Sequence, residues 1–326
     1  MEKIIIATPL GYGRCSSPYV FSDGVEIREL TPILWESSVA GKLLSEHERE
    51  YLDASQYWLS ISQLVEKRHL YQTDDDLLAR ARQAMYALQI ICPCGGRNVY
   101  LKLRETAGGL DNVGSWHPAQ MRGTRMGRLA AMEDQGLQED FDKVFYGVRR
   151  AFDEDVVRLQ NAIVLLEHGL QMGHMYLSPL MWVMGLDMLF MAGEKEPFVE
   201  RLVGFLGRAT QVFPAVYQDL QPQLQISEIV DDVYELRNIV AHGREIPEKP
   251  FREMRNILDT TGASITSDYT YAQIVMESAL FLLSKSLRKV MVDGLVELVR
   301  DEAQWKQTLK TGARLEQGRV GPATTI

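Results

Sequence analysis

The sequence has little of what marks a secreted protein, a membrane-spanning protein, or a protein with nucleic-acid-binding charge over its whole surface. It contains three cysteines, and an odd number with one close pair offers no disulfide framework. No apolar run approaches the roughly 18–20 residues of a membrane span, and the first residues lack the features of a secretory signal. Basic residues are outnumbered 35 to 44, for a net charge of −9. We therefore expect a cytoplasmic protein without membrane contact, whose nucleic-acid contacts, if any, are confined to a local basic site.

What the chain does have is enough apolar material for more than one core. It has 326 residues, 46% of them hydrophobic, and a single core stops growing near about 250–300 residues. The expected secondary structure changes near the middle of the sequence, from a mixture of strands and helices to almost wholly helices. We predict a mainly α protein: a smaller mixed α/β domain at residues 1–134, an all-α domain at 135–310 and a flexible tail at 311–326.

Hydrophobic periodicity and turn residues predict the individual elements. In the first domain we expect short strands within residues 3–8, 18–31 and 98–104, helices within 46–67 and 77–91, and a loop at 108–127. From about residue 135 onward the second domain is expected to be almost wholly helical, with helices within residues 153–173, 175–192, 197–210, 226–242 and 269–310. The last of these should break near Gly294.

Two short motifs favour ordinary turns over cofactor or metal binding. Gly11 and Gly13 resemble half of a dinucleotide fingerprint, but Ser16 stands where the third glycine belongs. Cys92 and Cys94 are separated by one residue and have no second pair downstream, whereas structural zinc sites usually need two such pairs, or one pair plus histidines. The sequence thus predicts neither a cofactor nor a metal site.

The most informative segment is residues 226–243, which has the pattern of a helix with one apolar face. At 100° per residue, this face is formed by Ile226, Ile229, Val230, Val233, Leu236 and Val240. Arg237 falls on the edge of the apolar face, so its guanidinium should be partly buried and need an anionic partner or ligand. Asn238 and His242 lie four residues apart and share another face.

Arg237 and His242 together suit phosphodiester chemistry. An arginine binds a phosphate bidentately and stabilises the charge that develops on it. His242 lies at the helix C-terminus, where the dipole favours the imidazolium form, and can move a proton near neutral pH. The alternative is structural: Arg237 pairs with a buried carboxylate and His242 caps the helix. Asp187, which stands within an apolar face of the 175–192 helix, is the candidate carboxylate.

The segment resembles a known motif. Arg237-Asn238-x-x-x-His242-Gly243 is similar to the Arg-x4-6-His motif of the HEPN superfamily, and Tyr234 matches its usual aromatic residue. The resemblance extends to residues 158–162 in one helix and to residues 185–190, which are similar to the Ala-Leu-Glu segment of the Apea-like branch. It covers about residues 135–305.

The resemblance implies an all-α domain that dimerises, and in many members a metal-independent endoribonuclease of defence or toxin systems. Arg237 would then bind the phosphate, His242 would be the acid/base and Asn238 would orient them. Asp187 would hold Arg237, with Tyr234 and Gly243 in support. The implied partners are RNA, a second copy and a regulatory or antitoxin protein. The family also includes non-catalytic nucleotide-binding and protein-interaction modules, which is the alternative.

Arginines near the motif supply the expected contacts to RNA. Residues 237–255 contain five basic and three acidic side chains, a basic island in the half of the chain whose net charge is −7. The candidates for binding RNA phosphates are Arg244, Arg252, Arg255, Arg122, Arg125 and Arg128. The last three recur every third residue, so they could equally form a solvated helix face.

Overall fold

The computed structural model describes residues 2–10, 18–30, 33–34, 52, 57–66, 75–93, 99–116, 135–172, 177–191, 194–213, 224–242 and 271–319. The chain divides into two units, Met1–Arg149 and Arg150–Ile326. The first contains an antiparallel sheet and the second is all-helical, which confirms the predicted fold class. The division between the units lies inside helix α3 (Gln135–Asp153).

A seven-stranded sheet forms the framework of the first unit. Its strands are β1 (Glu2–Pro9), β2 (Tyr19–Val20), β3 (Val25–Glu29), β4 (Ile33–Leu34), β5 (Tyr57–Val65), β6 (Tyr100–Thr106) and β7 (Gly109–Trp116). They lie in the order β2-β3-β5-β1-β6-β7-β4, and all neighbours are antiparallel except β4 and β7. Ile4, Ile5 and Ile6 in the central strand are all fully buried, so both faces of the sheet are covered there.

Helices anchor to this sheet through specific contacts. Helix α2 (Asp75–Ile91) packs against β1 and β5. The short 3-10 helix η1 (Ser22–Gly24) ties the sheet to α3, because Ser22 donates hydrogen bonds to Asp142 from its backbone N–H and its hydroxyl. The rings of Phe21 and Phe141 also stack, with centroids 3.9 Å apart. These contacts explain why most of α3 belongs to the first unit.

Three predictions about secondary structure were wrong. Residues 57–65, expected to be helical, form β5, because Tyr57, Trp58 and Ile61 suit a strand that pairs with β1 on one side and β3 on the other. Residues 109–116, expected to be a loop, form β7 and make a hairpin with β6. The tail expected from residue 311 is helical as far as Arg319, and residues 320–326 lie outside the described residues.

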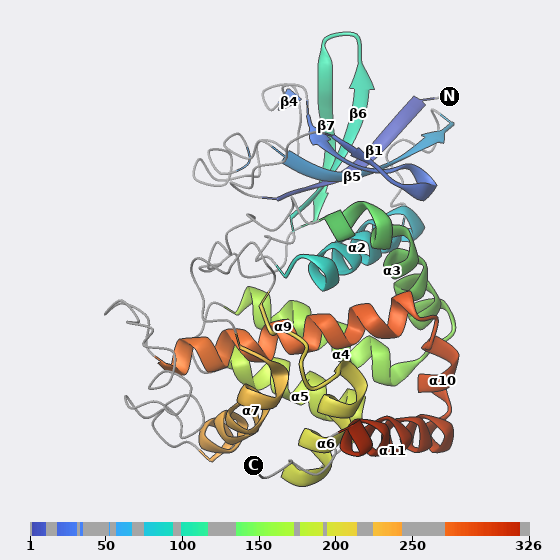
Figure 1. Ribbon diagram of the computed structural model, residues 1–326. Helices are drawn as coiled ribbons and strands as arrows, with labels where there is room; N and C mark the ends of the chain where they lie inside the picture. The colour runs from blue at the N-terminus through green and yellow to red at the C-terminus, as the bar shows by residue number, and fades with distance from the viewer. Residues whose placement is uncertain are drawn as a thin grey trace. The chain divides into compact units, whose positions relative to one another are not determined.

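The second unit consists of packed helices, which Figure 1 shows with their labels. They are α4 (Val157–Gln171), α5 (Leu177–Phe190), α6 (Lys195–Leu206), α7 (Ile226–Ala241), α9 (Tyr271–Val292), α10 (Val296–Arg300) and α11 (Glu302–Arg319). Helices α4 and α5 pack against each other and against α9, while α7 packs against α5, α6 and α9. The predicted break near Gly294 is confirmed: its φ is +67°, and Leu295 N–H donates to the Val290 carbonyl at 2.9 Å.

None of the helices in the described ranges is both long enough and apolar enough to cross a bilayer.

Candidate functional site

The motif lies on α7, whose start is fixed by its own residues. Gln225 accepts a hydrogen bond from the backbone of Glu228, and the Glu228 carboxylate accepts one from the Gln225 N–H at 2.7 Å. This reciprocal pair satisfies two of the N–H groups that a helix start leaves open. Residues 224–226, at the start of α7, form backbone hydrogen bonds with residues 210–212, which follow α6. This pairing fixes where α7 begins relative to the end of α6.

The apolar face predicted for α7 is its buried face. Five of the six predicted residues are at most 1% exposed, and Val240, near the helix end, is half-buried. Arg237 lies at the edge of this face with 31% of its side chain exposed, as the periodicity predicted. The helix therefore presents the guanidinium at the boundary between core and solvent.

Three side chains orient the Arg237 guanidinium. Nη2 lies 3.6 Å from Oδ2 of Asp187 on α5, so the ion pair expected between these residues is present. Nη1 donates a hydrogen bond of 3.1 Å to Oδ1 of Asn238. The guanidinium carbon lies 5.6 Å from the centroid of the Tyr234 ring, within the range of a cation–π contact.

Tyr234 and the neighbouring acids of α7 are themselves held by α6. The Tyr234 ring packs against the Phe198 ring, with centroids 5.2 Å apart. Lys195 Nζ lies 3.0 Å from Asp231 Oδ1, and this hydrogen bond raises the pKa of Lys195 above its ordinary value. The platform beneath Arg237 is thus built from α5, α6 and α7.

Asp187 is positioned by an unusual concentration of donors at the C-terminus of α5. Arg158 donates to the Met188 carbonyl at 2.8 Å, and the Trp305 indole donates to the Leu189 carbonyl at 2.7 Å. Buried Arg201 donates to the carbonyls of Phe190 and Met191. The last turn of a helix leaves its carbonyls without intrahelical partners, and here side chains from α4, α6 and α11 supply them. Sequence reasoning missed Arg201, although it stands in an apolar stripe with Phe198 and Leu202.

His242 ends α7 as its C-cap residue and is exposed. Its backbone N–H donates to the carbonyl of Asn238 at 3.1 Å, as in a helix, but its own φ of −93° and ψ of 9° are not helical. Arg237 thus lies near the end of α7, held by its neighbours, and His242 lies directly after the last helical residue, open to solvent.

The remaining predicted residues lie outside the described ranges. These are Gly243, Arg244, Arg252, Arg255, Arg122, Arg125 and Arg128, together with Gly11, Gly13 and Cys94. Cys92 is buried and is not part of a disulfide. Within the described part of the chain, no group of three or more His, Cys, Asp or Glu side chains is placed to hold a metal ion.

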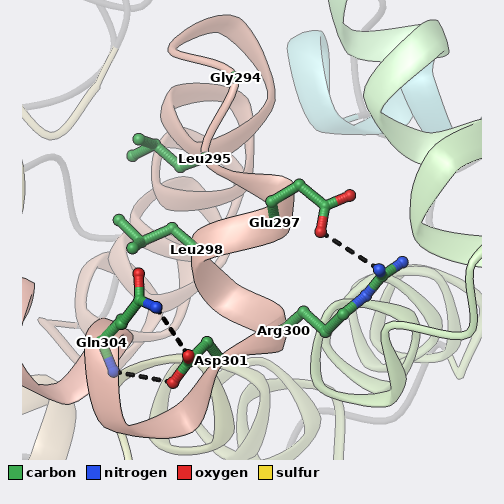
Figure 2. A pocket seen from close by; sticks show the side chains of 7 residues that line it. All are labelled: Gly294, Leu295, Glu297, Leu298, Arg300, Asp301 and Gln304. Atoms are coloured by element: carbon green, nitrogen blue, oxygen red, sulfur yellow. Dashed lines mark hydrogen bonds and ion pairs between the residues drawn. The ribbon is translucent and has the colours of Figure 1, made fainter.

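A hollow at the corner between α9, α10 and α11 is a different place from the α7 motif. Figure 2 shows its lining residues, which include Glu297, Arg300, Asp301 and Gln304. Arg300 pairs with Glu297 at 3.2 Å, and Asp301 caps α11 by accepting from the Gln304 N–H at 3.0 Å. These polar groups bind one another, so the hollow is a structural corner and adds nothing to the motif.

No family model, curated protein or solved structure matches the chain.

Proposed function

We propose that the protein is a metal-independent endoribonuclease of the HEPN type that acts as a dimer. The observation behind the proposal is that Arg237 is oriented by its neighbours at the edge of the core, while exposed His242 follows five residues later at the end of the same helix. A positioned guanidinium and an exposed imidazole are groups that can carry out phosphodiester transfer without a metal.

Arg237 keeps capacity for a phosphate. A guanidinium has five N–H donors, and among the described residues Arg237 uses one in a hydrogen bond, to Asn238. Its contact with Asp187 at 3.6 Å is longer than the roughly 2.7–3.2 Å of a direct N–H···O bond. The carboxylate therefore orients the charge while outward N–H groups stay available to an incoming phosphate.

The proposed reaction is an internal transfer within RNA. The ribose 2′-oxygen attacks the adjacent phosphorus, the bond from phosphorus to the 5′-oxygen breaks, and the products are a 2′,3′-cyclic phosphate and a 5′-hydroxyl. One proton must leave the 2′-hydroxyl and another must reach the 5′-oxygen, on opposite sides of the phosphorus. His242 serves one of these positions and His242 of a second copy serves the other, while Arg237 stabilises the charge on the phosphate.

A second candidate is a non-catalytic HEPN module that binds a nucleotide or a protein. It is favoured by one observation: Arg237 already has an anionic partner and an aromatic partner within its own chain. In that case both residues serve stability, and His242 is a surface residue that caps α7.

Cleavage of RNA in EDTA by the wild-type chain, Arg237→Ala and His242→Ala separates the two. The endoribonuclease predicts cleavage that both substitutions abolish, with cyclic phosphate ends on the products. His168→Ala is the matched control, because His168 is also exposed and, like His242, stands at the C-terminal end of a helix. Equal cleavage by all four proteins, or by none, would reject the proposed activity.

A further inference from the structure

Helix α11 carries a row of cations with no acid between them. Lys306, Lys310 and Arg314 follow one another at four-residue spacing, and residues 303–315 contain no Asp or Glu. Lys306 and Lys310 are both exposed, and at 100° per residue they lie about 40° apart on one side of the helix. We call the exposed surface at Lys306 and Lys310 the basic face. It belongs to the half of the chain whose net charge is −7.

The lysines of the basic face lack the acidic partners that other lysines of the second unit have. Lys289, for example, pairs with Asp293 at 2.8 Å. Within the described residues neither Lys306 nor Lys310 forms an ion pair, and Glu302, the acid nearest to Lys306 in sequence, pairs with an arginine of α4 at 3.4 Å. The positive charge of the basic face is therefore not neutralised inside the chain.

Nothing in helix α11 itself favours this row of charges. Like charges four residues apart repel each other and destabilise a helix. The helix dipole stabilises cations in the last turn, whereas Lys306 lies in the second turn of α11. A row of unpaired cations that costs helix stability suits an anionic ligand from outside the chain.

The opposite side of α11 is anchored to the rest of the second unit. Trp305 is fully buried, and its indole donates to the Leu189 carbonyl at the end of α5 at 2.7 Å. Gly312 lies so close to α6 that an added Cβ atom would be 3.2 Å from the Gly204 carbonyl oxygen. Figure 1 shows α11 beside α6. The basic face is thus carried by a helix that is fixed relative to α5 and α6.

We propose that the basic face of α11 binds the phosphates of a single-stranded RNA, away from the bond that is cut. The inference rests on the proposed function, because it takes RNA as the ligand and the motif on α7 as the place of cleavage. Contacts to phosphates position a strand without reading its bases. The basic face therefore strengthens the binding of long strands whatever their sequence, and the chemistry stays with Arg237 and His242.

The distance between α11 and the motif sets the length of RNA that contacts both. Helices α7 and α11 both pack against α6, and the axes of packed helices lie about 8–10 Å apart. The axes of α7 and α11 are then on the order of 20 Å apart, which about six nucleotides span at about 3.4 Å each. A dinucleotide bound at the motif does not reach the basic face, whereas a strand of about 16 nucleotides does.

Binding to a strand that cannot be cut tests the basic face separately from cleavage. A 2′-O-methyl RNA of about 16 nucleotides lacks the attacking hydroxyl, so fluorescence anisotropy measures binding alone. Lys306→Gln/Lys310→Gln should bind more weakly than the wild-type chain. The slope of log Kd against log salt should fall by about 1.4, since each phosphate contact to a single strand contributes about 0.7. Lys143→Gln/Lys289→Gln, which removes the same charge from α3 and α9, should keep the wild-type slope.

Cleavage of a long RNA and of a dinucleotide then separates the basic face from the motif. On the long RNA, Lys306→Gln/Lys310→Gln should raise KM several-fold and leave kcat unchanged, and on the dinucleotide it should match the wild-type chain. A wild-type slope in this variant, an equal loss in the control, or a wild-type chain that binds no RNA would overturn the inference. Wild-type cleavage together with an unchanged slope in the variant rejects the basic face alone. A reduced slope in the variant of a chain that cuts no RNA rejects the ribonuclease alone.

Discussion

Replacing Gly169 by alanine should destabilise the contact between α4 and α5. A Cβ atom at this position would lie 2.2 Å from Nε1 of Trp182 and less than 3 Å from two further atoms of the indole. The indole would have to move, and with it would go the buried hydrogen bond of 3.3 Å from Trp182 to the Leu166 carbonyl. Since α4 and α5 pack through this contact, the effect should reach the helix that carries Asp187.

The magnitude follows from three opposing contributions. Overpacking a core site costs about 1–3 kcal/mol, and leaving a buried donor without a partner costs about 1–3 kcal/mol. Alanine gains about 1 kcal/mol over glycine inside a helix. The free energy of unfolding should therefore fall by about 1–5 kcal/mol, which urea titration followed by tryptophan fluorescence can measure.

The control for Gly169→Ala relieves the clash. In a Trp182→Phe background the smaller ring lacks Nε1, so adding Gly169→Ala should cost clearly less than it does in the wild-type chain. A Gly169→Ala protein that is more stable than wild type would refute the reasoning, because that is the result expected of a helical glycine with open space around it.

Three other changes test separate parts of the structure. Hydrogen bonding to Arg150 lowers the pKa of Glu154 below 4.5. The charged carboxylate therefore stabilises the fold above pH 4.5, and this stabilisation is lost as pH falls through the lowered pKa. Glu154→Gln should lower the unfolding temperature at neutral pH but not in strong acid. Arg201→Met removes charge-assisted bonds to the end of α5 and should cost about 2–3 kcal/mol in urea unfolding, whereas Arg208→Met, at an exposed position, should change stability by less than about 0.5 kcal/mol. Gly294→Ala meets no steric neighbour but must adopt a φ of +67°, and should lose about 1–2 kcal/mol by the same measurement.

The helices of the second unit could be predicted because their periodicity is local. The sequence predicted α7 with its buried face, the break at Gly294 and the acid at residue 187 within an apolar face. Residues 57–65 could not be predicted in the same way. Their pattern fits a helix or a strand, and the choice depends on β1 and β3, which are distant in sequence.

Within the candidate site, the sequence predicted the Arg237–Asp187 pair but not what holds it. The donors to the last carbonyls of α5 come from residues 30, 116 and 11 positions away, and no pattern within α5 indicates them. Arg201 was the one donor with a local signal, a charged residue in an apolar stripe. Such a residue is expected to have a buried partner, whether or not it also has a function.

Cleavage of RNA in the presence of EDTA tests the central claim most directly. With wild-type protein and His242→Ala at equal concentration, the rate constant should fall at least about 100-fold in the variant, since a general acid or base contributes about 10²–10⁴. His168→Ala should cut at the wild-type rate, and the wild-type products should end in a 2′,3′-cyclic phosphate. If His242→Ala cuts as fast as the wild-type chain, or if the wild-type chain cuts no RNA, the ribonuclease proposal is contradicted.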